Sequence, residues 1–497
     1  MSARGAVLAL AALAFAPAGT QAQTSISERQ LAAARDLERD GQLEQARALY
    51  RQIVERDPAG AWSDDALLAL ARLAAPIDSP QRLGEVTVPT AMLEQARADL
   101  ERIRKEMPAS DSAPEAMYRL ALLRLVPQSP SYDVDEATAL LTTLPVLHPG
   151  APQVPEARVL AARLHLHAGR TDRARALAFE SLTAEPNGPL AAEAWDVLAQ
   201  AEARSGTAEG VLPLLGKAQL AGPPDSPTVA RAIDLATLAD RLAFAGARAA
   251  GPFAAAEATP LAGKPADLAV DGNGTVHAAL PRDNAILSLA RGAQQFERRA
   301  AQGIIALGVD GWGRLCWVGA PGITLGDGTV IAVPPDVRPV AIAPAGPRGA
   351  WIVDDRANRL IRVEPGGAAA ATAALPPRAL PAAAVADGQG GAWVLELRAP
   401  SLVHVGANGE LVGSVSLAGT AEKPVDLERD ELGNVYVLDA RSATVLLFAP
   451  TGKPLLRWPQ AVSGGESPLA KATLLTVERT GALGVYDSRA GRFTWYR

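Results

Sequence analysis

A motif of two short strands joined by a tight turn recurs in the second half of the chain, and it constrains the fold more than any other feature. The copies align without gaps on Gly274, Gly313, Arg348, Gly390, Gly433 and Gly481. Three residues before these anchors stand Asp271, Asp310, Ala345, Asp387, Asp430 and Glu478. Apolar residues alternate on either side of this Asp-x-x-Gly turn, as half-buried strands require.

The anchors are separated by 39, 35, 42, 43 and 48 residues. Paired short strands repeated at about 40 residues are the signature of β-propeller blades. We therefore predict a six-bladed propeller over residues 250–497. The last copy ends with its third strand, so residues 252–259 are predicted to supply the fourth strand and close the ring, which removes an exposed sheet edge.

One copy, "PVDLERDELGNVYVLDARSATVLLFAPTGKPL", resembles a blade of the NHL-repeat family. The residue types that match are Pro424, Asp430, Gly433, Tyr436, Val437, Asp439 and Phe448. The resemblance runs from Pro265 to the last residue, is good in the copies at residues 339, 381 and 424, and is weak at 304. It implies a six-bladed propeller.

The first half of the chain has helical periodicity and its own repeat, in which a Pro ends each helix. The template recurs as Ala46-Tyr50-Ile53-Pro58, Ala96-Leu100-Ile103-Pro108 and Ala137-Leu141-Leu144-Pro149, and more weakly as Ala174-Ala178-Ser181-Pro186 and Val211-Leu215-Ala218-Pro223. Gly41, Gly169 and Gly206 precede three of these copies, where a tight turn would join two helices.

The segment "DGQLEQARALYRQIVERDP" resembles the second half of a tetratricopeptide (TPR) repeat. The copies are separated by 50, 41, 37 and 37 residues, so the predicted array is irregular. We predict a TPR-like solenoid over residues 23–249. Such arrays present a concave face to a peptide or partner; the alternative is that the chain's own next domain fills this face.

The turn after the second strand of the blades carries a repeated basic residue. Eight residues after the anchors stand Arg282, Pro321, Arg356, Arg398, Arg441 and Arg489, and six after them stand Leu280, Gly319, Asp354, Glu396, Asp439 and Asp487. Because these turns emerge on one propeller face, we predict a ring of charged side chains there. The ring has two interpretations. The guanidiniums brace the carboxylates of the same or the next blade, or some of them bind an anionic ligand.

The sequence offers no recognisable catalytic motif, so no cofactor and no metal are predicted. Asp267 and Asp426 share a column of the first strand with Ala306, Ala341, Ala383 and Leu474, which makes a poor divalent-cation site. His277 shares a column with Tyr436 and is expected to be packed. His165 and His167 are two apart on a predicted helix and do not face one another, so both are read as ordinary surface or groove residues.

The N-terminus predicts export. Arg4, an apolar run over residues 6–16 and small residues at Thr20 and Ala22 describe a signal peptide over residues 1–22. No later run is long enough to span a bilayer. The single Cys316 excludes an internal disulfide, and a net charge of −6 without a Lys/Arg block does not indicate nucleic-acid binding.

Together these features predict an exported, periplasmic scaffold without enzymatic activity. Its groove and propeller face would bind protein or glycan partners of the bacterial cell envelope, including anionic ones. The alternative is a propeller-type metal-dependent lactonase or esterase with a helical targeting domain.

Overall fold

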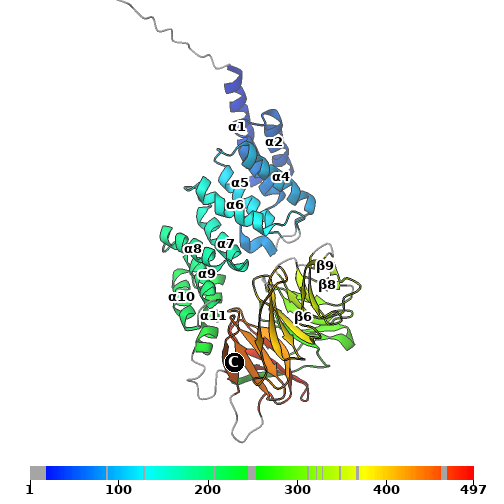
Figure 1. Cartoon of the computed structure of the whole chain (residues 1–497). Coiled ribbons are helices and arrows are strands. Elements are labelled where there is room, and N and C mark those ends of the chain that lie inside the picture. Colours follow the sequence, from blue (N-terminus) through cyan, green and yellow to red (C-terminus); the bar gives the residue numbers. More distant parts are fainter. Residues whose placement is uncertain are drawn as a thin grey trace, which may run out of the picture. The chain divides into compact units, whose positions relative to one another are not determined.

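The computed structural model describes residues 18–84, 88–126, 129–204, 208–243, 253–310, 313–320, 322–326, 328–345, 349–364, 369–459 and 467–497. Within them a helical region precedes a region of strands (Figure 1). The helices are α1 (Ala18–Arg39), α2 (Leu43–Arg56), α3 (Ser63–Ala74), α4 (Thr90–Glu106), α5 (Ala113–Arg124), α6 (Val134–Leu147), α7 (Val154–His167), α8 (Thr171–Ala184), α9 (Ala191–Ala203), α10 (Ala208–Ala221) and α11 (Pro227–Ala243), with a short 3-10 helix at Pro80–Gly84. This confirms the predicted order of a helical-repeat region followed by a propeller.

The repeat template marks every second helix, and its first three positions form the buried stripe. In α2, Ala46, Tyr50 and Ile53 are buried, and the equivalent residues of α4, α6, α8 and α10 are buried as well. Gly41 and Gly169 adopt φ of +76° and +72°, which L side chains rarely adopt, and each makes the predicted turn between two helices. Gly206 lies outside the described residues.

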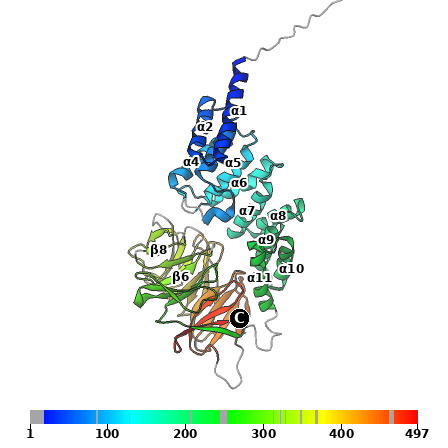
Figure 2. The ribbon, with the colours of Figure 1, turned by 180° about the vertical axis from the view of Figure 1, so that it is seen from behind.

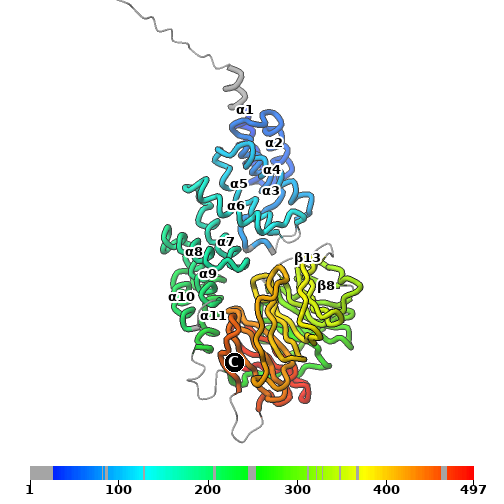
Figure 3. The backbone as a smooth tube through the Cα atoms, in the orientation of Figure 1, coloured from blue at the N-terminus to red at the C-terminus, as the bar shows by residue number. Residues whose placement is uncertain are grey.

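The strands form six sheets of four, one for each predicted blade. The first five sheets are β2–β5 (Asp267–Val270, Val276–Leu280, Ala285–Leu289, Glu297–Ala300), β6–β9 (Ala306–Val309, Leu315–Val318, Gly322–Thr324, Val330–Ala332), β10–β13 (Pro339–Pro344, Ala350–Asp354, Arg359–Val363, Ala369–Ala374), β14–β17 (Pro381–Ala386, Ala392–Glu396, Ser401–Val405, Leu411–Ser416) and β18–β21 (Pro424–Arg429, Val435–Asp439, Thr444–Phe448, Pro454–Trp458). The tube in Figure 3 follows these blades in chain order from green to red.

The sixth sheet closes the ring as predicted. It joins β22 (Ala472–Val477), β23 (Leu483–Asp487) and β24 (Arg492–Tyr496) to β1 (Ala255–Pro260), which comes from the start of the domain. Strand β1 runs antiparallel to β24, with Ala258 opposite Thr494. Figure 2 shows the ribbon from behind, with the C-terminus at the part of the propeller drawn in orange and red. The closure covers the edge of β24, and Phe253 packs edge-on against Trp458, 5.0 Å between ring centroids. The Pro252 of the predicted strand lies outside the described residues.

The Asp-x-x-Gly turn has a defined geometry that explains its repetition. In the fifth blade the Asp430 carboxylate accepts hydrogen bonds from the backbone N–H of Asn434 at 2.9 Å, its side chain at 2.8 Å, and the Tyr436 hydroxyl at 2.9 Å. Gly433 adopts φ of +90° and donates its N–H to the Asp430 carbonyl. The turn therefore needs an acceptor at its start and a residue without Cβ strain at its end.

By internal contacts the chain forms two compact units, Met1–Gln153 and Val154–Arg497. The second unit combines α7 to α11 with the propeller, so the predicted boundary between residues 249 and 250 stays a prediction. Among the described residues, no helix combines the length and the apolar content that crossing a bilayer requires.

Within the second unit, the helices pack on the ends of the blades that carry the Asp-x-x-Gly turns. Leu432 of one such turn is buried in a cluster with Leu235 and Leu238 of α11. Beside it, the Glu431 carboxylate forms ion pairs with the guanidinium of Arg231 of α11 at 3.0 Å and with that of Arg479 of the last blade's turn at 2.6 Å. In this unit the chain's own propeller therefore contacts α11 of the helical array.

Candidate anion-binding face of the propeller

The structure places all the predicted ring residues in equivalent turns at one end of the blades. The carboxylates of Asp354, Glu396, Asp439 and Asp487 belong to the last residues of β11, β15, β19 and β23. Arg356, Arg398, Arg441 and Arg489 follow two residues later, and Arg282 follows β3 in a short 3-10 turn, Pro281–Asp283. The side chains of all five arginines are exposed.

The carboxylates do not bind the guanidiniums of these arginines. Each accepts instead the backbone N–H of the arginine two residues on, at 3.2 Å for Arg356, 2.7 Å for Arg398, 3.1 Å for Arg441 and 2.8 Å for Arg489. In these four turns the guanidinium does not bind the carboxylate two residues before it. Bracing within the blade is seen for Arg441, whose guanidinium pairs with Glu422 of the loop that enters the same blade. The carboxylate holds the backbone of the turn, and the arginine side chain is exposed to solvent.

The same carboxylates also hold the loop that enters the blade. Asp439 accepts from the backbone N–H of Glu422 at 2.6 Å and of Lys423 at 2.8 Å. Asp354 and Glu396 accept in the same way from Arg338 at 3.2 Å and Leu380 at 2.9 Å. All three carboxylates are buried. Burial alone would raise the pKa of Asp439, but the N–H groups of Glu422, Lys423 and Arg441 and the Ser442 side chain hold it below its usual value.

The loop entering each blade carries a second column of basic residues that the sequence analysis missed. Ten residues before the anchors stand Lys264, Gly303, Arg338, Leu380, Lys423 and Lys471. The aligned copies alone could have revealed it, because four of the six residues at this position are Lys or Arg. Because Pro339 pairs with Asp354, and Pro424 with Asp439, the start of the first strand lies beside the end of the second. Both basic columns therefore lie on the same face.

Some basic groups of this face are paired with acidic neighbours. Arg441 lies 2.9 Å from Glu422, Arg338 lies 2.6 Å from Asp355, and Arg359 bridges Asp354 at 3.0 Å and Asp336 at 2.6 Å. In the described part of the chain, no hydrogen bond or ion pair involves the guanidiniums of Arg282, Arg356, Arg398 or Arg489. Four of the five ring cations are thus available to a partner.

The ring face lies at the opposite end of the blades from the helices. The Asp-x-x-Gly turns join the first strand to the second, whereas the ring turns join the second to the third, so antiparallel pairing puts them at opposite ends. The contacts of α11 with Glu431, Leu432 and Gly481 all involve Asp-x-x-Gly turns. The helical packing of this unit therefore leaves the ring turns uncovered.

Asp267 and Asp426 join neighbouring blades at the innermost strands. Asp267 accepts from the backbone N–H of Leu307 in the next blade at 2.8 Å, and Asp426 accepts from Leu475 in the next blade at 2.7 Å. Burial raises the pKa of Asp267 to about 7; burial and the nearby charge of Asp267 raise that of Asp426 to about 8. Burial also raises the pKa of Glu428 on the same strand. Asp267 and Asp426 serve as inter-blade clamps.

His277 is held by side chains of its own blade. His277 is buried, with Nδ1 2.8 Å from the Ser288 hydroxyl and Nε2 3.2 Å from the Asp271 carboxylate, which confirms that it is packed. No group of three or more His, Cys, Asp or Glu in the described ranges has the arrangement of a metal site.

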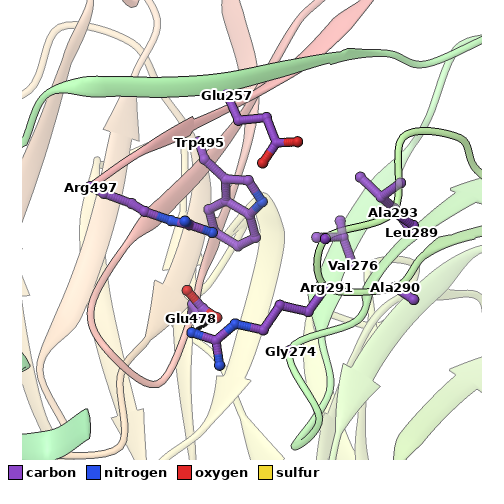
Figure 4. Close-up of a pocket in the computed structure, with 11 residues that line it drawn as sticks. Glu257, Gly274, Val276, Leu289, Ala290, Arg291, Ala293, Glu478, Trp495 and Arg497 are labelled. Atoms are coloured by element: carbon purple, nitrogen blue, oxygen red, sulfur yellow. Dashed lines mark ion pairs between the residues drawn. The ribbon is translucent and has the colours of Figure 1, made fainter.

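Two recesses lie away from the ring face, one in each unit. A groove of about 440 Å³ on α4 to α6 is lined by apolar residues such as Met117, Leu140 and Leu147 and by the polar Arg104 and Glu136. Figure 4 shows the second recess, between the first and last blades, where Arg291 reaches Glu478 beside Trp495. Its volume of about 10 Å³ matches about one water molecule, so of these two recesses in the described residues the groove is the one with room for a partner's side chains.

No family model matches the chain, and no curated protein matches it. Among solved structures, a streptogramin B lyase aligns over 49% of this chain and 97% of its own, at 16% identity and a TM-score of 0.39. The β-propeller domain of Cps50 (Swd1) from Myceliophteria thermophila aligns over 49% of this chain and 99% of its own, at 8% sequence identity and a TM-score of 0.37. The MamA protein aligns over 40% of this chain and 92% of its own, at 15% sequence identity and a TM-score of 0.30. These similar structures have mixed functions, and likenesses this weak carry no argument about activity.

Proposed function

We propose that this protein is an exported, non-enzymatic scaffold of the bacterial cell envelope whose propeller face binds an anionic protein or glycan partner. One observation carries the binding proposal. The carboxylates two residues before the ring arginines accept backbone N–H groups. Within the described residues the guanidiniums of Arg282, Arg356, Arg398 and Arg489 make no hydrogen bond or ion pair, and the helices of the same unit leave this face uncovered. The groove on α4 to α6 offers a second surface of mixed apolar and polar character for a peptide.

Guanidiniums suit this role because their planar donor fork matches carboxylate, sulfate and phosphate oxygens. Arginine is also charged at any physiological pH, so binding would not depend on titration of the ring. Several such groups at similar positions on successive blades favour an extended partner with several negative charges over a single small anion. Export is supported by the N-terminal pattern of one Arg, an apolar run and small residues.

The ring can be tested without disturbing the fold, because replacing these arginines by Ala keeps the backbone N–H that each carboxylate accepts. The test variant carries Arg282→Ala, Arg398→Ala and Arg489→Ala. The control variant carries Arg29→Ala, Arg51→Ala and Arg173→Ala, which removes the same charge from exposed helical positions. Binding of poly-L-glutamate, as a model acidic peptide, and polygalacturonate, as a model acidic glycan, is measured by biolayer interferometry.

The proposal predicts a fall in affinity of about tenfold for the test variant with the preferred probe, since each exposed charge pair contributes about 0.2–1 kcal/mol. The control variant should bind as the wild type does. Equal affinity of the two variants would contradict the proposal. A stoichiometric metal ion in the purified protein would count against the absence of enzymatic activity and favour the hydrolase alternative.

A further inference from the structure

A second set of basic side chains lies on the other end of the propeller, where the helices meet it. Arg163 and His167 are one turn apart on α7 and therefore on the same helical face. Arg204, just after α9, donates a hydrogen bond from Nη1 to the Leu166 carbonyl, next to His167. Arg429 belongs to β18 of the fifth blade. Residues distant in the sequence thus converge on one place.

Two guanidiniums of this set meet at a single residue, Gly388. The Arg204 Nη2 lies 3.4 Å from the Gly388 carbonyl. The Arg429 guanidinium lies so close to Gly388 that a Cβ there would be 2.5 Å from its Nη2. Arg429 also donates from Nη1 to the Ala386 carbonyl at 3.3 Å, while its buried Nε has no hydrogen-bond partner in the described residues. Two positive groups are therefore held together in a half-buried place, which is costly without a counter-charge.

The neighbouring carboxylates offset only part of this positive charge: Asp387 lies near both Arg204 and Arg429, and Asp430 lies near Arg429. Asp387 accepts from the backbone N–H of Gln389 at 2.6 Å and of Gly391 at 2.8 Å, and it lies 3.0 Å from His404 Nε2. Asp430 is held by Asn434 and Tyr436 in its own turn.

A further pair of carboxylates nearby is also matched by charge. Arg231 binds Asp196 at 2.8 Å and Glu431 at 3.0 Å, and Arg479 binds Glu431 at 2.6 Å. These pairs leave Arg163, Arg204 and Arg429 with fewer negative than positive groups around them.

His167 lies in the field of these cations and remains accessible to solvent. Partial loss of solvation where α7 meets the propeller, together with repulsion from Arg204, Arg231, Arg163 and Arg429, lowers the pKa of His167 below its usual value. At neutral pH the imidazole is uncharged and can donate one hydrogen bond.

We propose that Arg163, His167, Arg204 and Arg429 form a binding site for a small tetrahedral oxyanion, phosphate or sulfate, between α7 and the propeller. Guanidiniums and an imidazole N–H are the donors that such an anion accepts. A bound anion would neutralise the two guanidiniums at Gly388 and link the helices to the fifth blade. This site is independent of the ring face and does not rest on the proposed function.

Phosphate is the probe, and thermal unfolding of the full-length protein is followed as its concentration increases, against sodium chloride at matched ionic strength. The site predicts a saturable rise in the unfolding temperature with phosphate that chloride does not reproduce. Isothermal calorimetry then gives the affinity, and glucose 6-phosphate is titrated in parallel. Tighter binding of the ester would identify a phosphorylated ligand, and weaker binding the free anion.

The key variant is Arg163→Gln, since the structure shows no hydrogen bond or ion pair of Arg163 within the described residues and the fold should tolerate the change. Arg163→Gln and Arg429→Gln should each weaken phosphate binding about tenfold, the value of one charge-assisted hydrogen bond. Arg51→Gln on α2 is the control and should bind as the wild type does. Equal stabilisation by phosphate and chloride, or unchanged phosphate affinity in both variants, would overturn the proposal.

Discussion

Replacing Asp439 tests the division of labour in the ring turns, in which the carboxylate holds the turn and the arginine does not. The Asp439 side chain is fully buried and accepts three backbone N–H groups within 3.1 Å, those of Glu422, Lys423 and Arg441. Asp439→Ala leaves these donors without their acceptor. Hydrogen bonds to a charged group contribute about 1.5–3 kcal/mol each, and water reaching the turn recovers part of the loss. We expect a destabilisation of about 3 kcal/mol.

Arg441→Ala is the matched variant in the same turn. Its guanidinium pairs with Glu422, and the two side chains are 74% and 63% exposed, so the loss should be about 0–1 kcal/mol. Both variants are measured by urea unfolding at pH 7, followed by tryptophan fluorescence. Equal losses, or a larger loss for Arg441→Ala, would refute the reasoning. The lowered pKa of Asp439 adds a second check. The carboxylate stabilises the fold above its unfolded pKa of about 3.9, so the effect of Asp439→Ala should shrink as the pH falls below about 4.

Three further predictions follow from other parts of the chain. A chain beginning at Gly263 lacks β1 and should lose cooperative unfolding or aggregate, whereas one beginning at Ala250 should not; equal thermal stability would count against ring closure by β1. Folding raises the pKa of Asp426 to about 8, so the folded state holds a proton that the unfolded state has released. Stability should therefore fall as the pH rises from about 4 towards 8, and Asp426→Asn should make that slope shallower in urea titrations; an unchanged slope would contradict it. Mass spectrometry of the exported protein should show a start near Gln23, and an intact Met1 in a cytoplasmic fraction would disprove export.

The architecture could be predicted because both halves repeat. Residues spaced like Ala46, Tyr50 and Ile53 lie on one face of a helix, so the pattern predicts a buried stripe. The Asp-x-x-Gly pattern predicts a turn because its Gly can adopt a positive φ. The closing strand could also be predicted, since the last copy lacked a strand and the segment before the first copy had one to offer.

The use of the ring carboxylates could not be predicted from spacing. A carboxylate two residues before an arginine can bind either its guanidinium or its backbone N–H, and both choices give the same sequence pattern. In the folded protein Asp439 binds backbone N–H groups, because the loop that carries Lys423 brings a second N–H donor to its carboxylate. Clamps such as Asp267 to Leu307, and the meeting of Arg204 with Arg429 at Gly388, depend on neighbours that only the folded ring brings together.

The salt dependence of binding is the most direct test of the central claim that the ring face recognises an anionic partner. Affinity for the preferred polyanion is measured from 0.05 to about 0.3 M sodium chloride, a range over which screening shortens the reach of exposed charges to less than about 10 Å. Wild-type affinity should fall steeply with salt, and the variant with Arg282→Ala, Arg398→Ala and Arg489→Ala should show a distinctly shallower dependence. Binding that is independent of salt, or a triple variant with the wild-type slope and affinity, would contradict the account.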